Sequence, residues 1–197
     1  MKWLFLKGVC IMVNKARFLR QMVVLALSVF SLLWLRPAIS ATGTQIDQEV
    51  DSALKTLYAS SATAKALGDK ATGVLVLPNI VKGGFVLGAQ GGDGALMKGG
   101  KNAGYYNSFA LSVGWQAGLQ SYAYAIFFVG DAAMKDFEAS NGFEIGVGPN
   151  IVFLDAGAAK DMDTLTGRTG VYGMIFDQKG LMLGISLQGA KITKINR

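Results

Sequence analysis

The sequence predicts an α+β fold in which a curved antiparallel β-sheet, or a partly closed barrel, carries N-terminal helices and one inserted helix. Stretches that alternate between bulky and small residues recur after residue 100, and a period of two is typical of β-strands. Glycines, 26 in 197 residues, lie inside and between these stretches, where they favour bends and bulges. Helical spacing of apolar residues is confined to a segment before residue 70 and a short one after residue 130. Typical strand lengths indicate about six to eight strands.

The first 41 residues have the organisation of a secretory signal peptide. A basic start precedes an apolar run over residues 22–35, and Arg36-Pro37 ends that run before a few small residues. The run is short for a membrane span, which needs about 20 residues. We therefore expect cleavage after Ser40 or Ala41, a periplasmic or secreted and membrane-associated protein, and one mature domain over 42–197. An uncleaved anchor is the alternative, and Met12 is a second candidate start.

Charge and composition argue against several functional classes. The formal net charge is +6, but six of the 19 Lys and Arg residues lie before residue 41, and 19 − 6 = 13 equals the 13 Asp and Glu residues. The net positive charge therefore comes from the first 41 residues, and nucleic-acid binding is not expected of the mature domain. The one cysteine, Cys10, is in the leader without a lipobox, and the chain has no histidine. The mature domain is therefore expected to hold no cofactor, no Cys/His metal site and no His-activated nucleophile. Its acids are scattered, without an acid/base pair, so no enzyme is expected.

The segment after the leader predicts two helices. Thr44 to Asp47 resembles a capping box at a helix start. One helical face is apolar, at Ile46, Val50, Leu54 and Leu57. Ser60-Ser61 interrupts the pattern, and a short second helix is predicted over Thr63 to Asp69. The first helix is acidic, whereas membrane-surface helices are usually basic, so we expect it to pack on the sheet.

The next stretch, Gly73 to Leu96, organises the predicted sheet. Val74 to Leu77 predicts a buried strand, Pro78-Asn79 punctuates it, and Ile80 to Gln90 predicts a second one. Gly91 to Gly94, with its Asp-Gly pair, predicts a tight turn. The glycines fit neither G-x-G-x-x-G nor the Walker loop, so a phosphate-binding loop is not expected.

The remaining elements follow from alternation and turn signals. We expect a long strand over Tyr105 to Leu119 and a central strand over Tyr122 to Val129. A helix capped by Asp131 is predicted to run to Ala139, with Asn141-Gly142 ending it. The C-terminal part begins with a predicted strand over Phe143 to Leu154, bent at Pro149, and a loop over Asp155 to Gly167. A strand over Val171 to Phe176 and a hairpin turn over Asp177 to Gly180 are predicted next. The last predicted strand runs from Leu181 to Leu187, and Ala190 to Ile195 extends it.

The predicted strands share an asymmetry between their two faces. In the long strand, one face carries Tyr105, Phe109, Leu111, Val113, Trp115 and Leu119, and the other carries Ser108, Ala110, Ser112, Gly114, Gln116 and Gly118. We expect the bulky faces to form the core. The small faces allow close approach by a partner, for which a helix of the same chain is favoured over a ligand.

Four ordered segments resemble the SYLF-domain family. They are Gly73 to Leu96, Gly104 to Ser108, Gln116 to Tyr122, and Gln178 to Met182 leading to Gln188 through Ile192. The resemblance covers almost the whole chain after residue 42. It implies a non-enzymatic lipid-binding domain, since SYLF domains are associated with phospholipid and phosphoinositide binding, and with actin in fungal members. A secreted, bacterial-looking protein narrows that expectation to phospholipid or membrane-surface binding in the cell envelope. The alternative is a structural or protein-partner-binding envelope module that uses the small-residue face or a sheet edge.

Lysines beside glycine turns are the expected lipid-binding residues. The mature domain has no net charge, so attraction to anionic lipid requires a local cluster, at about 1 kcal/mol per basic residue. Turns expose their side chains, and glycine lets the backbone approach a head group. Ordinary solvated turn lysines are the competing interpretation. The candidates are Lys82, Lys98, Lys101, Lys179, Lys191 and Lys194.

Overall fold

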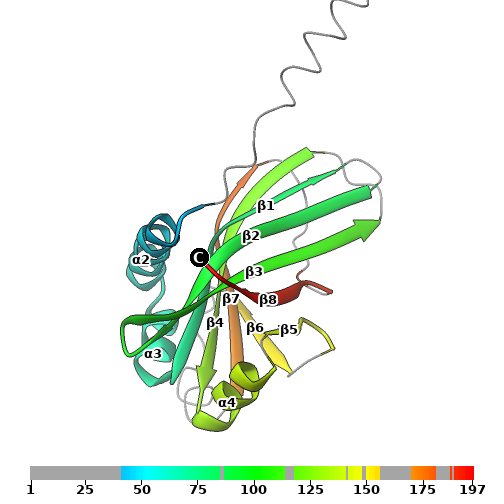
Figure 1. Cartoon of the computed structure of the whole chain (residues 1–197). Helices are drawn as coiled ribbons and strands as arrows, with labels where there is room; N and C mark the ends of the chain where they lie inside the picture. The colour runs from blue at the N-terminus through cyan, green and yellow to red at the C-terminus, as the bar shows by residue number, and fades with distance from the viewer. Residues whose placement is uncertain are drawn as a thin grey trace, which may run out of the picture. The chain divides into compact units, whose positions relative to one another are not determined.

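One eight-stranded sheet forms the centre of the part of the chain that the structure describes (Figure 1). The computed structural model describes residues 41–84, 87–113, 118–140, 142–147, 150–155, 170–180, 187 and 189–197, all within one compact unit, Ala41–Arg197. The strand order is β5-β8-β3-β2-β1-β4-β7-β6, and all neighbours are antiparallel except the parallel β6 and β7. The strands are β1 (Gly73–Gly84), β2 (Leu87–Lys98), β3 (Lys101–Val113), β4 (Gly118–Val129), β5 (Gly142–Glu144), β6 (Ile151–Asp155), β7 (Gly170–Gly180) and β8 (Lys191–Ile195).

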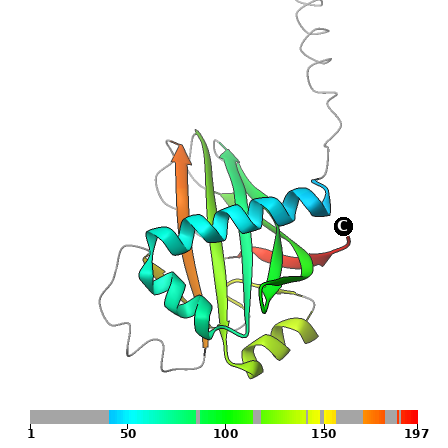
Figure 2. The same ribbon diagram turned by 90° about the vertical axis from the view of Figure 1, so that its left-hand side faces the viewer.

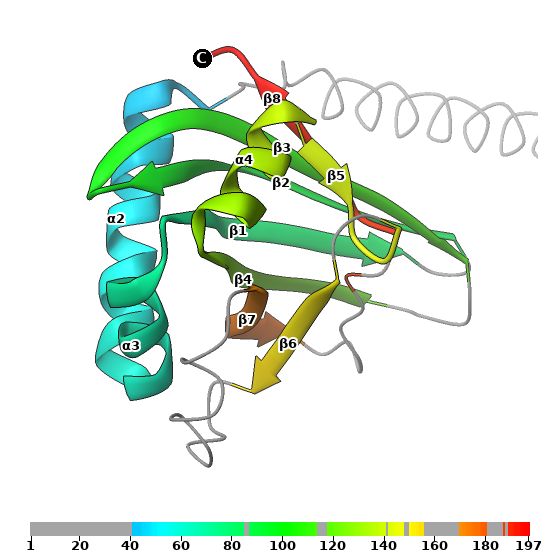
Figure 3. The ribbon, with the colours of Figure 1, turned by 90° about the horizontal axis from the view of Figure 1, so that it is seen from below.

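The sheet curls, and helices pack on both of its faces (Figure 3). The helices are α2 (Gly43–Ser60), α3 (Ala62–Lys70) and α4 (Asp131–Ala139). We call the face covered by α2 and α3 the outer face, and the face toward α4 the inner face. The predicted α+β fold with a curved sheet, N-terminal helices and one inserted helix is confirmed.

Each face has its own hydrophobic core. On the inner face, Phe137 of α4 stacks on Phe128 at 4.7 Å between ring centroids and lies 5.0 Å from Tyr106. On the outer face, Ile46, Val50 and Leu57 of α2 are buried against β1, β2, β4 and β7, together with Leu67 of α3. The first helix therefore packs on the sheet, as its acidic composition indicates.

The helix starts differ in detail from the predicted ones. The N-cap of α2 is Thr42, whose hydroxyl accepts a hydrogen bond from the Gln45 amide at 3.3 Å while Gln45 Oε1 accepts from the Thr42 amide at 2.9 Å. The capping box thus lies two residues before the predicted one. Asp131 is the first residue of α4 rather than its cap, and it accepts a hydrogen bond from the Thr72 hydroxyl at 3.0 Å.

Two predicted turns are strand interiors. β1 runs through Pro78-Asn79, where a bulge shifts its register, and Gly91 to Gly94 lie inside β2. Gly92 and Gly94 are needed for close approach rather than for a turn, since a Cβ on either would collide with the backbone carbonyl of Asn79 or Val76. Asp177 to Gly180, predicted as a hairpin turn, also belong to a strand, β7.

Several strand boundaries also differ. β3 ends at Val113, and Leu119 belongs to β4. The predicted strand over Phe143 to Leu154 is two strands, β5 and β6, with a turn at 145–147 between them, and Gly142 opens β5. Asp155, the first residue of the predicted loop over Asp155 to Gly167, ends β6. Asn141, Pro149, the rest of that loop, and residues 181–186 of the predicted strand over Leu181 to Leu187 lie outside the described residues.

The expectation that the bulky faces form the core is wrong for β3. Ser108 and Ala110 face the inner core and are buried, whereas Phe109 and Leu111 are exposed. Period two distinguishes the two faces of a strand, but it does not reveal which face the rest of the chain covers.

Candidate functional site

Four adjacent strands continue past α2 and leave their outer face uncovered. α2 crosses the strands, and the strands project beyond it on the side away from α4 (Figure 2). We call these projecting ends the strand tips, and define them as residues 80–84 of β1, 87–92 of β2, 108–113 of β3 and 118–122 of β4. No other helix of the described residues packs on the outer face at the tips.

The outer face of the tips carries large exposed apolar side chains, which we call the outer patch. Leu87, Leu111 and Leu119 are each about two-thirds or more exposed, at 72%, 73% and 67%. Val81 and Phe109 are exposed to nearly half of their area. A contiguous exposed apolar patch usually marks a surface that contacts something apolar.

Cross-strand register places Leu111 and Leu119 in one row, with small residues between them. Leu111 of β3 pairs with Ala89 of β2, Ala89 with Gly83 of β1, and Gly83 with Leu119 of β4. One step closer to α2, a second row crosses six strands: Lys191, Phe109, Gly91, Val81, Ser121 and Lys179. The outer patch thus has a lysine at each lateral end.

The inner face of the same tips carries buried polar side chains. Lys82 of β1 pairs with Gln90 of β2 on one side and Gln120 of β4 on the other. All three are at least 93% buried. The Tyr122 hydroxyl donates to Gln90 Oε1 at 2.9 Å, and burial raises the pKa of Tyr122. Within the described part of the chain, Gln120 Oε1 has no hydrogen-bond partner.

The strand tips therefore have an inverted pattern, apolar outside and polar inside. The rest of β4, from Ala123 to Val129, is instead apolar and covered on both faces. A structure in water normally buries its apolar side chains, whereas one that enters an apolar layer exposes them and satisfies its polar groups internally. The tips follow the second arrangement in exposing apolar side chains and burying polar ones, although Gln120 Oε1 has no hydrogen-bond partner among the described residues.

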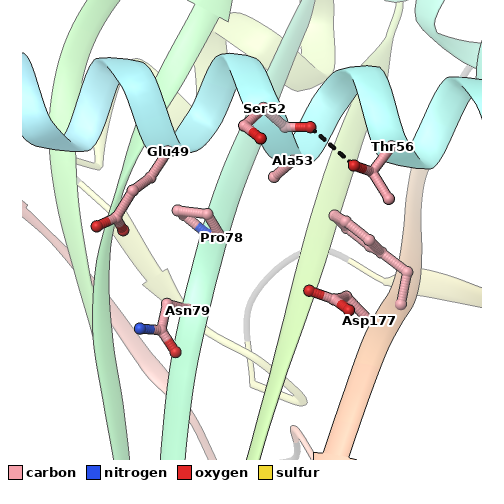
Figure 4. A pocket seen from close by; sticks show the side chains of 8 residues that line it. Glu49, Ser52, Ala53, Thr56, Pro78, Asn79 and Asp177 are labelled. Atoms are coloured by element: carbon pink, nitrogen blue, oxygen red, sulfur yellow. Dashed lines mark hydrogen bonds between the residues drawn. The ribbon is translucent and has the colours of Figure 1, made fainter.

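A groove separates the tips from α2 (Figure 4). Its volume is about 220 Å³. Two strand irregularities form its floor: the β1 bulge at Pro78-Asn79 and a register shift in β7. The groove is lined by Glu49, Ser52, Ala53, Thr56, Pro78, Asn79, Phe176 and Asp177.

Two carboxylates are among the lining residues, and that of Asp177 is already paired. The side chain of Glu49 extends from α2 toward the sheet. The carboxylate of Asp177 points from β7 into the space below the helix (Figure 4). Lys179 Nζ contacts Asp177 Oδ2 at 2.9 Å, and both side chains remain largely exposed. Among the described non-glycine residues, only Asp177 has a positive φ, 50°. This conformation, which aspartate tolerates, aims its side chain at the groove.

The six lysines predicted as a lipid site do not lie together. Lys82 is buried inside β1 and not exposed at a turn. Lys98 and Lys101 lie at the far end of the sheet, where Lys98 Nζ contacts Glu138 Oε1 at 2.8 Å. Lys179 and Lys191 flank the outer patch. In the register of β5 and β8, Lys191 lies opposite Glu144.

The last predicted lysine, Lys194, is on β8 opposite Tyr106. It lies in the same five-residue strand as Lys191 but outside the row that crosses the outer patch. The structure therefore places two of the six lysines beside the exposed apolar residues.

Sequence reasoning missed the residues that define the tips and the groove. Gln90 ends the predicted strand over Ile80 to Gln90, and Gln120 falls between two predicted strands, so nothing in the sequence indicated that both are buried. Glu49, Phe176 and Asp177 are far apart in the sequence, and only the crossing of α2 over β1 and β7 unites them.

No helix in the described residues is long and apolar enough to cross a bilayer. In the same residues, no group of three or more His, Cys, Asp or Glu side chains is placed to hold a metal ion.

Comparison with known families identifies the C-terminal part of the chain. Residues 109–197 match the model of the Ysc84 family, described as Las17-binding protein actin regulator. This match is consistent with a SYLF-domain protein. The match begins within β3 and includes β4, β7 and β8, and thus half of the strand tips. No curated protein matches the chain.

Proposed function

We propose that this SYLF-domain protein is a non-enzymatic lipid-binding protein that docks on a phospholipid membrane surface through its strand tips. The observation that carries the proposal is the inverted pattern of the tips: Leu87, Leu111 and Leu119 are exposed, while Lys82, Gln90 and Gln120 are buried behind them. Burying one leucine-sized side chain in an apolar environment is worth about 1.5–3 kcal/mol. Three such side chains on one surface are enough for reversible membrane attachment.

The positions of two lysines support docking with the strand tips toward the lipid. Lys179 and Lys191 lie at the two lateral ends of the Phe109–Val81 row, so they would reach the head groups when the tips enter the bilayer. Basic residues near an anionic surface add about 1 kcal/mol each. The acidic α2 packs on the sheet behind the tips, so it would lie outside the acyl region of the bilayer, at the level of the head groups.

The proposal extends to location. The basic, apolar and small-residue order of residues 1–41 supports secretion through a cleaved signal peptide, into the periplasm or the exterior. There the domain would meet membrane surfaces but not the actin named in the family description. N-terminal sequencing of the secreted protein should begin at Ala41 or Thr42.

Vesicle co-sedimentation tests the membrane site. Changing Leu111→Ser together with Leu119→Ser should weaken binding at least about tenfold, because each ten-fold corresponds to about 1.4 kcal/mol and two leucine contacts exceed that. Val152→Ser is the matched control, since Val152 is 43% exposed on β6 and pairs with Tyr172, near the end of β7 that lies away from the tips. Equal binding by the double variant and the control would contradict the proposal.

A protein-binding envelope module is the second candidate. β6 stands at the end of the strand order, and its Val152 and Phe153 are exposed to about two-fifths of their area. An end strand can accept an added strand from a partner. The description of the matched family also names a protein partner. Absence of vesicle binding by the wild type would favour this candidate.

A further inference from the structure

The groove beside α2 has the chemistry to recognise one class of lipid head group. We propose that it binds the ammonium group of an amine phospholipid of the phosphatidylethanolamine type, while the acyl chains of the same layer contact the outer patch. The inference rests on the proposed membrane docking, which sets the groove at head-group level. It adds a preference for amine head groups, which membrane docking alone does not require.

The position of the groove follows from the register of the strands. In β1 the groove residues Pro78 and Asn79 are followed after Ile80 by Val81 of the outer patch. In β7 the groove residue Asp177 is followed after one residue by Lys179, which pairs with Ser121 in the row that contains Val81. The groove thus opens directly behind the outer patch, where a head group lies when the apolar side chains are in the acyl region.

The lining of the groove favours a cation with N–H donors. Glu49 and Asp177 supply carboxylate oxygens, and Asn79 supplies an amide oxygen. The hydroxyl of Thr56 already donates to the Ser52 carbonyl at 3.0 Å, so its oxygen remains able to accept. Phe176 is the one aromatic ring in the lining, whereas a quaternary ammonium is typically held by an aromatic cage. A primary ammonium therefore fits better than choline.

The size of the groove and the neighbouring lysine fit the rest of such a head group. About 220 Å³ is below the range of roughly 300–1,000 Å³ for drug-sized ligands, and it suits a group of a few heavy atoms. The exposed Lys179–Asp177 ion pair is weakly held. When a zwitterion binds, its ammonium can take the place of Lys179 on Asp177, and Lys179 can turn to the phosphate.

The experiment compares vesicles that differ in one head group. Vesicles of phosphatidylcholine alone, of phosphatidylcholine with phosphatidylethanolamine, and of phosphatidylcholine with phosphatidylglycerol are used with the mature protein. We expect the wild type to bind the phosphatidylethanolamine vesicles about tenfold more tightly than phosphatidylcholine alone, as charged hydrogen bonds allow. The variant Glu49→Gln with Asp177→Asn should lose this preference.

The phosphatidylglycerol vesicles distinguish recognition of the amine head group from general attraction between the protein and a charged surface. The double variant carries two fewer negative charges, so its binding to phosphatidylglycerol vesicles should be unchanged or stronger while its preference for phosphatidylethanolamine disappears. Asn tolerates the positive φ of residue 177, which protects the fold of the variant. Asp51→Asn is the matched control, because Asp51 is an exposed acid of α2 outside the groove.

The outcomes distinguish the two proposals. Equal binding of the wild type to phosphatidylcholine and phosphatidylethanolamine vesicles would overturn the head-group site and leave membrane docking intact. A preference that persists in the double variant would likewise overturn it. Failure of the wild type to bind any vesicle would overturn membrane docking. In that case soluble phosphorylethanolamine is titrated by NMR, and absence of shifts at the Ser52 and Asn79 amides would overturn the groove site as well.

Discussion

At the scale of single residues, burial of tyrosine hydroxyls shapes the interior of the sheet. Tyr106, Tyr122 and Tyr124 are almost fully buried on the inner face, and burial raises the pKa of each. The largest rises are at Tyr122 and Tyr124, next to the buried polar row. A phenol in this environment strongly favours its neutral form.

Alkaline pH should therefore destabilise the fold. Above the ordinary tyrosine pKa of about 10, the unfolded chain loses phenolic protons that the folded chain keeps. The stabilising contribution is fully present below pH 10, and it is lost as pH rises toward the higher folded pKa values. Urea unfolding at a series of pH values should show the midpoint falling above about pH 10. A midpoint that is constant up to pH 12 would contradict this.

A glycine in β2 provides a steric test. A Cβ at Gly94 would collide with the backbone carbonyl of Val76, whereas one at Gly91 would come no closer than 3.3 Å to the Ser108 carbonyl. We expect Gly94→Ala to destabilise the domain by about 1–3 kcal/mol, as overpacking does. Gly91→Ala is the matched control, with a smaller loss in urea unfolding. A reversed order would show that β1 and β2 can move apart there.

At the scale of elements, α2 decides which part of the outer face is covered. Its apolar residues bury the half of the sheet near α3, and Asp47 at its start accepts a hydrogen bond from the Tyr105 hydroxyl at 3.1 Å. This contact and the capping box hold the first turn of the helix against β3. The strand tips remain uncovered because α2 crosses the strands rather than running along them (Figure 2).

Loss of the cap should weaken α2 measurably. Thr42→Ala removes the acceptor for the Gln45 amide, and N-cap losses of this kind cost about 1 kcal/mol. Urea unfolding should report a loss of that size. Thr42→Ser, which keeps the hydroxyl, is the control and should retain most of the stability. If alanine and serine variants unfold alike, the cap contributes nothing to the folded domain.

At the scale of the whole molecule, the two ends of the sheet differ in surface chemistry. One end carries the hairpin with Lys98 and Lys101, and Lys98 is paired with Glu138 of α4. The other end carries the outer patch with Lys179 and Lys191 beside it. Both pairs bring two positive charges, so charge reversal at each tests which end faces a membrane.

The lysine pairs should respond differently in vesicle binding. Lys179→Glu with Lys191→Glu should weaken binding to anionic vesicles at low salt by tenfold or more, at about 1 kcal/mol per basic residue near the surface. The control variant, Lys98→Glu with Lys101→Glu, has the same change of charge and should bind nearly as the wild type. The opposite result would place the membrane at the hairpin end of the sheet.

Local patterns determined much of the fold. Four-residue and three-residue spacings of apolar side chains predicted α2, and the break at Ser60-Ser61 predicted the start of α3, because a helix needs an apolar stripe and a polar cap. Unbroken apolar residues from Tyr122 to Val129 predicted a central strand, and these residues of β4 are buried. The ordered motifs gave the SYLF resemblance, which the family match over 109–197 confirms.

Only the tertiary structure decided the candidate site. The alternation in Tyr105 to Leu119 separated Phe109 and Leu111 from Ser108 and Ala110, yet the inner core took the smaller residues. Strand periodicity is a local property, whereas the position of a face depends on where a distant helix crosses the sheet. The bulge at Pro78-Asn79 and the path of α2 leave the leucines of the tips exposed, and they bring Glu49 to the same groove as Asp177. No spacing within the sequence carries that information, because the contacts join residues more than 100 positions apart.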